Sequence, residues 1–253
     1  MGSQIGDPDE LTVLVTGFGP FREQYPVNPS WEIASGLPPY LPPLRAKDPN
    51  SRHAAVALPK VRILVHPQPI RVNYRVVRDL VPTFYETYHG RKVDMVIHIG
   101  MAGPRPFYCI ERRGHRDGYK HADVDGEIPD EEEERKPGSD WPWRGLPEEI
   151  ESDLDIPDVL ALWQGHSSKD MDLRISDDPG RYLCDFIYYS SLAELWKLQR
   201  RRRVVFLHVP ADASPESIEK GRELAVNLVR SVVESEMSRK DKPQESVGGD
   251  GEL

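Results

Sequence analysis

Short apolar runs alternate with longer segments in which apolar residues recur at helical spacing. The runs are rich in β-branched residues and predict buried strands over residues 11–16, 61–66, 93–99, 172–176 and 204–209. Helical spacing predicts a short helix that opens at Asn28 or Ser30, and helices over residues 72–88, 159–163, 182–199 and 215–236. Because strands alternate with helices, we expect an α/β fold: a three-layer α/β/α sandwich around a mostly parallel, twisted sheet.

Two stretches show neither period. Residues 38–60 are rich in Pro and Ala, and residues 123–152 are acidic and Pro-rich, with four consecutive glutamates. We expect both to be surface loops, the acidic one solvated or disordered. Residues 1–10 are expected to form a flexible N-terminus, residues 11–236 a single α/β domain, and residues 237–253 a disordered polar tail.

Charge and cysteine content narrow the classes of partner. The net charge of -9 over 253 residues predicts a surface that repels nucleic acid. The one basic run, residues 200–203, is expected to cap a helix C-terminus rather than bind phosphate. No apolar stretch approaches the roughly 20 residues of a membrane span, and the N-terminus lacks the apolar core of a signal peptide. With only two cysteines, the chain is expected in the cytoplasm.

Cys184 is the first candidate for chemistry. It follows the turn at Gly180 and falls in the first turn of the helix predicted over residues 182–199. Unpaired backbone N–H groups at a helix start favour an anion, and a thiol pKa of about 8.5 is lowered to about 3.5–7.5 in such places. The alternative is a small buried core cysteine, and the residues alone leave the two interpretations about even.

A histidine and a glutamate are the candidate partners. His208 ends the apolar run 204–209, where it is either a satisfied structural histidine or a general base for Cys184. Glu111 follows the run 107–110, and it either forms an ion pair with a neighbouring arginine or orients the histidine. Cys109, two residues before Glu111, is interpreted as structural.

Other motifs are missing. The glycine-rich segment 17–21 lacks the Gly-Lys-Ser/Thr of a phosphate loop, and no G-x-S-x-G nucleophile elbow occurs. The eight histidines and two cysteines show no H-x₃-H or C-x₂-C spacing, so we expect no metal site and no cofactor.

Four ordered blocks resemble the pyroglutamyl peptidase I family, cysteine peptidases that remove N-terminal pyroglutamate. The resemblance covers most of residues 11–235. The blocks are Val15-Thr16-Gly17-Phe18-Gly19-Pro20-Phe21 with Asn28-Pro29-Ser30-Trp31, Ile99-Gly100-Met101-Ala102-Gly103 with Glu111, Gly180-Arg181-Tyr182-Leu183-Cys184-Asp185-Phe186-Ile187-Tyr188-Tyr189, and Phe206-Leu207-His208-Val209-Pro210.

The resemblance implies a catalytic set of Cys184 as nucleophile, His208 as base and Glu111 as its acidic partner. It makes the domain a hydrolase whose substrates are peptides that begin with pyroglutamate. A thiolate attack on the pyroglutamyl carbonyl and a thioester intermediate follow from these roles.

The resemblance also implies the substrate-binding residues. Phe18 and Phe21 lie against the pyrrolidone ring, and the backbone carbonyl of Met101 accepts the lactam N–H. Many members of the family have Gln at the position of Met101. Tyr182 and Leu183, just before the nucleophile, complete the expected set.

Two other functions stay open at this point. A catalytically weak or inactive member of the family would bind peptides on the same fold, although all three catalytic positions are filled. An amidase of the Cys-Glu-Lys type ranks last, because no lysine ends a comparable strand.

Overall fold

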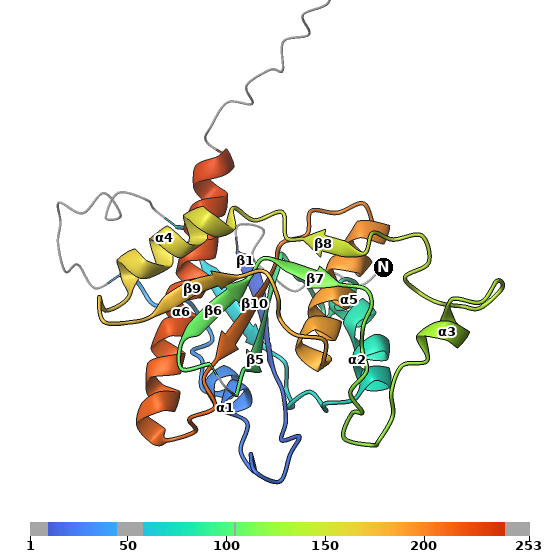
Figure 1. The fold of residues 1–253 in the computed structure, drawn as a ribbon. Coiled ribbons are helices and arrows are strands. Elements are labelled where there is room, and N and C mark those ends of the chain that lie inside the picture. Colours follow the sequence, from blue (N-terminus) through green and yellow to red (C-terminus); the bar gives the residue numbers. More distant parts are fainter. Residues whose placement is uncertain (1–9, 45–57, 104, 241–253) are drawn as a thin grey trace, which may run out of the picture.

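A six-stranded sheet runs through the centre of the protein in its computed structural model, which describes residues 10–44, 58–103 and 105–240 (Figure 1). Five of its strands confirm the predicted apolar runs to within two residues, and the short strand β6 is the additional one. The strands are β1 (Leu11–Gly17), β2 (Val61–Val65), β5 (Met95–Met101), β6 (Tyr108–Glu111), β9 (Leu173–Ser176) and β10 (Val204–Val209).

The strand order is β2-β1-β5-β10-β6-β9. Neighbouring strands are parallel at four of the five pairings, and only β6 runs antiparallel to its neighbour β10. The expected mostly parallel sheet is therefore confirmed. The reversal at β6 places Cys109 opposite His208, and Glu111 opposite Phe206.

Helices cover both faces of the sheet, so the three-layer sandwich is confirmed (Figure 1). One face carries α1 (Pro29–Ser35), α4 (Ile156–His166) and α6 (Pro215–Lys240). The other carries α2 (Tyr74–Leu80), the 3₁₀ turn η1 (Val81–Phe84) and α5 (Leu183–Lys197). Asn28 caps α1 by accepting a hydrogen bond from the Ser30 N–H, as one of the two predicted caps requires.

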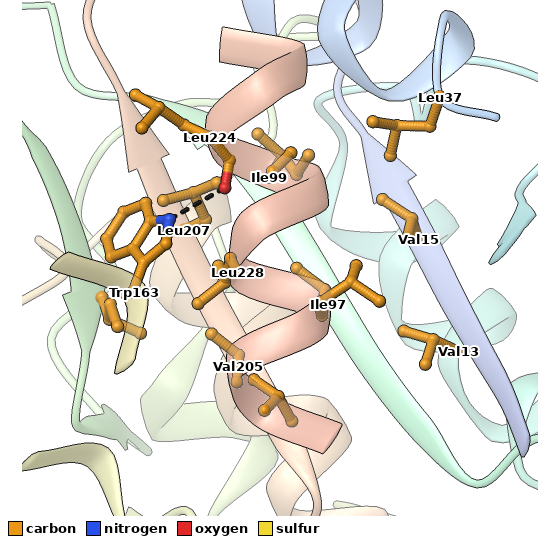
Figure 2. Packing of buried hydrophobic residues seen from close by; sticks show 14 of the residues in the cluster. Val13, Val15, Leu37, Ile97, Ile99, Trp163, Val205, Leu207, Leu224 and Leu228 are labelled. Carbon is orange, nitrogen blue, oxygen red and sulfur yellow. Dashed lines mark hydrogen bonds between the residues drawn. The ribbon is translucent and has the colours of Figure 1, made fainter. Parts of the chain in front are cut away.

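Alternate residues of the central strands form the core beneath α4 and α6 (Figure 2). The Trp163 indole N–H donates to the Leu224 carbonyl at 2.8 Å and so joins the two helices. Burial of each valine, leucine or isoleucine side chain in this core stabilises the fold by about 1.5–3 kcal/mol. The strand residues that contribute to this face include Val13, Val15, Ile97, Ile99, Val205 and Leu207.

The acidic segment 123–152 folds, contrary to the expectation of a solvated or disordered loop. It contains α3 (Glu131–Glu134) and β8 (Glu149–Glu151), which pairs with β7 (Arg113–His115). Trp143 is buried against the rings of Phe186 and Tyr189 in α5. A few buried apolar residues thus pack this segment against the core, although its average composition is that of a loop.

Two helices end at residues other than those predicted from the sequence. The helix expected over residues 72–88 stops at α2 and η1, since Pro82 lacks the N–H that an α-helix requires, and a two-stranded ribbon of β3 (Thr87–Tyr88) and β4 (Arg91–Lys92) follows. The last helix continues to Lys240, four residues beyond its predicted end. Residues 1–9, 45–57 and 241–253, which hold most of the predicted N-terminus, Pro-rich loop and tail, lie outside the described residues.

Three arginines of the basic run 200–203 form ion pairs, while the backbone N–H of Arg200 donates to the Leu195 carbonyl of α5 at 2.9 Å. Arg201 and Arg203 each bind the buried Glu236 carboxylate of α6 at 2.8 Å, and Arg202 binds Asp153. In the part of the chain that the structure describes, none of these side chains donates to a carbonyl of α5. The expected contact with the C-terminus of α5 is therefore made by the Arg200 backbone, whereas the guanidinium groups of Arg201, Arg202 and Arg203 bind carboxylates, which attract them more strongly than partial charges do.

Candidate active site

The carboxyl ends of three parallel strands meet at one edge of the sheet, as expected for a site in an α/β fold. Gly17 ends β1, Met101 ends β5, and His208 lies one residue before the end of β10. His208 is directly opposite Gly100 on β5 and opposite Cys109 on β6. The edge therefore gathers residues from blocks that are far apart in the sequence.

His208 and Glu111 form a buried pair. The Nδ1 atom of His208 lies 2.6 Å from the Oε1 atom of Glu111, and the two side chains are 3% and 0% exposed. We assign the proton of this bond to Nδ1, because a carboxylate accepts hydrogen bonds. With the proton on Nδ1, the Nε2 atom of the neutral ring is left to accept a proton.

Arg105 binds the same oxygen of the Glu111 carboxylate as His208 does. Its Nη1 atom donates to Glu111 Oε1 at 2.9 Å and lies 3.2 Å from the Cys109 sulfur, while Nη2 donates to the Asp178 carbonyl at 2.8 Å. The sequence suggested an ion pair with a neighbouring arginine as an alternative for Glu111, and the structure shows both an ion pair and the histidine contact.

The charge on Glu111 follows from these partners. Burial alone would raise the pKa of this carboxyl, but the hydrogen bond and positive charge offered by His208, with help from Ser176 and Arg105, lower it below its usual value. Glu111 is therefore ionised near neutral pH despite complete burial.

Cys184 stands in the first turn of α5, as predicted. The helix begins at Leu183, and the side chain of its N-cap residue Tyr182 donates to the Ala122 carbonyl rather than capping the helix. The thiol lies over Gly100: a Cβ atom at that glycine would come within 2.8 Å of the Cys184 sulfur and 2.5 Å of a Phe206 ring carbon. Gly100 therefore lets the helix start approach the strand that is paired with His208.

The expected lowering of the Cys184 pKa is wrong for this structure. Burial raises the pKa of the thiol, and the negative charges of Glu111 and Asp185 raise it further, against a smaller effect of Arg105. With its pKa raised, the resting thiol is protonated near neutral pH. In the part of the chain that the structure describes, the thiol makes no hydrogen bond to His208.

Four of the five expected substrate-binding residues belong to the core cluster against which Cys184 packs, or pack against it themselves. Phe18 and Leu183 are buried in the core under α5, at 3% and 1% exposure. Phe21 and Tyr182 are partly buried at the edge of the same core, with ring centroids 6.2 Å apart. Met101 is buried at the end of β5 and belongs to neither core cluster.

Three possible metal ligands come together although no metal motif occurs in the sequence. One ligand atom from each of Cys109, Glu111 and His208 lies within 4.8 Å of the others. The Arg105 guanidinium contacts two of these groups, so a positive charge already stands where a cation would bind. The spacing rules missed the cluster because its members sit on two strands paired across the sheet.

Relatives with known names place the chain in a family. The pyroglutamyl-peptidase 1 of Mus musculus is 33% identical over 203 residues, which are 80% of each chain. The chain belongs to the pyroglutamyl-peptidase 1 family. A pyrrolidone-carboxylate peptidase of Bacillus cereus is 26% identical over 242 residues, covering 87% of this chain and 94% of the other.

A solved structure shows the fold of this family. The pyrrolidone carboxyl peptidase of Thermococcus litoralis matches with a TM-score of 0.66 at 17% identity, over 94% of this chain and 100% of the other. The comparison with family models gives no match. The resemblance inferred from the four sequence blocks is confirmed by the relatives, and the expected fold by the structure.

Sequence reasoning missed Asp185, which follows the candidate nucleophile. Its buried carboxylate accepts hydrogen bonds from the His115 backbone N–H at 2.8 Å and from Arg181 at 3.2 Å, and it pairs with the His115 ring at 3.0 Å. These bonds tie the start of α5 to β7. An acidic residue inside a predicted apolar helix start was the available signal, but its partner lies 70 residues earlier in the chain.

Proposed function

We propose that this chain is a cysteine peptidase that hydrolyses the N-terminal pyroglutamyl residue from peptides, with Cys184, His208 and Glu111 as its catalytic residues. The observation that carries the proposal is the buried His208–Glu111 pair, since His208 lies on β10 directly opposite Gly100 of β5, which the Cys184 thiol covers. The names of the relatives state the same activity for those proteins.

The first chemical step transfers the thiol proton as the sulfur attacks. Because the resting thiol is protonated, His208 Nε2 accepts the proton while the sulfur bonds to the pyroglutamyl carbonyl carbon. Glu111 keeps Nδ1 protonated and stabilises the imidazolium that forms. The N–H groups at the start of α5 donate to the developing oxyanion, a contribution of about 3–4 kcal/mol for a well-placed donor.

The second step releases the peptide and then the pyroglutamate. The imidazolium returns its proton to the departing amine, the C–N bond breaks, and a thioester on Cys184 remains. Water then attacks the thioester with His208 as base, and the thiol is restored as pyroglutamate leaves.

A flat, neutral lactam suits a site made of aromatic and apolar side chains with a few backbone hydrogen bonds. In our proposal Phe18 and Phe21 contact the pyrrolidone ring, Tyr182 and Leu183 border it, and the Met101 carbonyl accepts the lactam N–H. A free amino terminus would bring an unpaired charge to these rings and is rejected.

The charge of the chain and the state of its cysteines support the proposed location and partners. No helix among the described residues has the length and apolar character needed to cross a membrane. Both cysteines are free thiols, which supports our proposal of the reducing cytoplasm as the location. The net charge of -9 supports peptides rather than nucleic acids as partners.

Turnover of fluorogenic amides tests the proposed activity. We expect the purified chain to release aminomethylcoumarin from its pyroglutamyl amide, and to leave the glutamyl and prolyl amides intact because each carries a charged amino terminus. Binding of the pyroglutamyl amide without turnover would instead support the alternative of an inactive, peptide-binding member of the family.

A further inference from the structure

A cavity of about 220 Å³ lies at the amino ends of β5 and β10. It is at the opposite edge of the sheet from His208 and Gly100, since both strands run from this cavity toward the candidate active site. Its residues include three of the four arginines of the basic run 200–203, which the proposed peptidase activity does not use. The lining consists of Tyr85, Lys92, Val93, Asp94, Met95, Val96, Leu195, Arg200, Arg201 and Arg203.

The lining combines an apolar floor with an excess of positive charge. The floor comes from buried side chains such as Met95 and Leu195. Four cationic side chains line the cavity, whereas two carboxylates pair with them: Asp94 binds Lys92 at 3.2 Å, and Glu236 is shared by Arg201 and Arg203. This excess is unusual in a chain whose net charge is -9.

The Arg200 guanidinium has more N–H groups than it uses in hydrogen bonds among the described residues. Its Nη1 atom donates to the Tyr85 carbonyl at 2.8 Å, which fixes the guanidinium at the cavity. Across the described ranges, Arg200 forms no ion pair with a carboxylate. A guanidinium held by one backbone carbonyl keeps a fork of N–H groups that suits the oxygens of a phosphoryl group.

We propose that this cavity binds a small phosphorylated metabolite. Its phosphoryl group lies against Arg200, Arg203 and Lys92, and its apolar portion packs on Met95 and Leu195. The volume is sufficient, because an apolar cavity of about 150 Å³ holds a benzene ring. The site is separate from the peptidase site and would be occupied together with it.

Phenyl phosphate is the probe, since it joins a phosphoryl group to an apolar ring. Isothermal calorimetry at low salt is expected to show one site per chain, with weaker binding of inorganic phosphate and no binding of phenol. Arg200→Gln is expected to raise the dissociation constant about tenfold, because it removes charge-assisted hydrogen bonds. Lys92→Gln, at a mostly exposed side chain that the fold does not need, is expected to raise it about threefold.

Arg174→Gln is the matched control. Arg174 is an exposed arginine of β9 that pairs with Asp172 away from the cavity, so its loss is expected to leave the dissociation constant unchanged. All three variants are expected to keep wild-type turnover of the pyroglutamyl amide, which verifies the fold. The proposal is overturned if phenyl phosphate shows no saturable binding, or if Lys92→Gln and Arg200→Gln bind it as the Arg174→Gln control does.

Discussion

At the scale of single residues, the proposed chemistry rests on how Glu111 is held. Its Oε1 atom accepts from both His208 and Arg105, at 2.6 and 2.9 Å, while its buried Oε2 atom has no hydrogen-bond partner among the described residues. An ionised carboxylate at such a position stabilises a charged imidazole. The Oε1 atom of Glu111 therefore both orients the His208 ring and places a negative charge beside it.

Replacing the base and its partner separates their contributions. His208→Gln is expected to lower turnover by about 10²–10⁴-fold, the usual contribution of general base catalysis. Glu111→Gln is expected to lower it by about 10- to 100-fold, since a neutral amide binds His208 more weakly than a carboxylate. Turnover of the pyroglutamyl amide is measured beside the melting temperature. Variants that lose stability but keep their turnover would make both residues structural.

The two phenylalanines differ in burial, so their replacements are expected to differ. Phe21→Ala, at a partly exposed ring, is expected to lower kcat/KM by about 30-fold, equivalent to about 2 kcal/mol of lost aromatic contact. Phe18→Ala also empties a core position at 3% exposure and is expected to lower the free energy of unfolding by about 3–5 kcal/mol. An unchanged kcat/KM for Phe21→Ala would remove that ring from the site.

At the scale of elements, the start of α5 is joined to β7 through Asp185. The helix presents Cys184 in its first turn, and the neighbouring Asp185 binds both the backbone and the ring of His115. The strand β8 that pairs with β7 belongs to the acidic segment that was expected to be a loop. This segment therefore helps to position the candidate nucleophile.

The Asp185 carboxyl makes stability depend on pH. Burial raises its pKa to about 6, against the opposing effect of His115, whereas an unfolded chain titrates an aspartate near about 3.9. The folded state therefore binds this proton more tightly, and that contribution is complete below about pH 4 and lost as the pH rises through about 6.

Urea unfolding of wild type and Asp185→Asn between pH 4 and 7 measures this contribution. The free energy of unfolding of wild type, relative to the variant, is expected to fall by as much as about 3 kcal/mol over the interval, at about 1.4 kcal/mol for each unit of pKa. A difference that stays constant with pH would show that Asp185 does not titrate there.

At the scale of the whole molecule, strands and helices with a clear apolar period could be predicted from the sequence. Contacts between residues far apart in the chain could not. The strands β1, β5 and β10 are mostly apolar and buried along nearly their whole length. Their positions in the chain, and the order of the helices between them, could therefore be predicted from the sequence. Trp143 and Ile150 are buried, but they lie among acidic residues that dominate the local composition. Sequence reasoning therefore predicted a loop where the chain forms β8 and packs on α5.

For the candidate site, local sequence pattern predicted the elements that carry Cys184 and His208, but not the electrostatics of these residues. Cys184 at a helix start and His208 near a strand end follow from local pattern. The contact of His208 with Glu111 joins residues 97 positions apart, and the pKa of Cys184 depends on burial that only the packed α5 and β5 create. A local helix-start rule predicted the opposite direction for that pKa.

Capture of the acyl-enzyme tests the central claim most directly. Wild-type protein mixed with a pyroglutamyl ester and quenched in acid is expected to carry one pyroglutamyl group, which peptide mass spectrometry locates on Cys184 and not on the buried Cys109. Cys184→Ala is expected to keep its fold, to carry no group and to show no turnover of the pyroglutamyl amide. A pyroglutamyl group on another residue, or a Cys184→Ala protein that retains near wild-type turnover, would contradict the proposed mechanism.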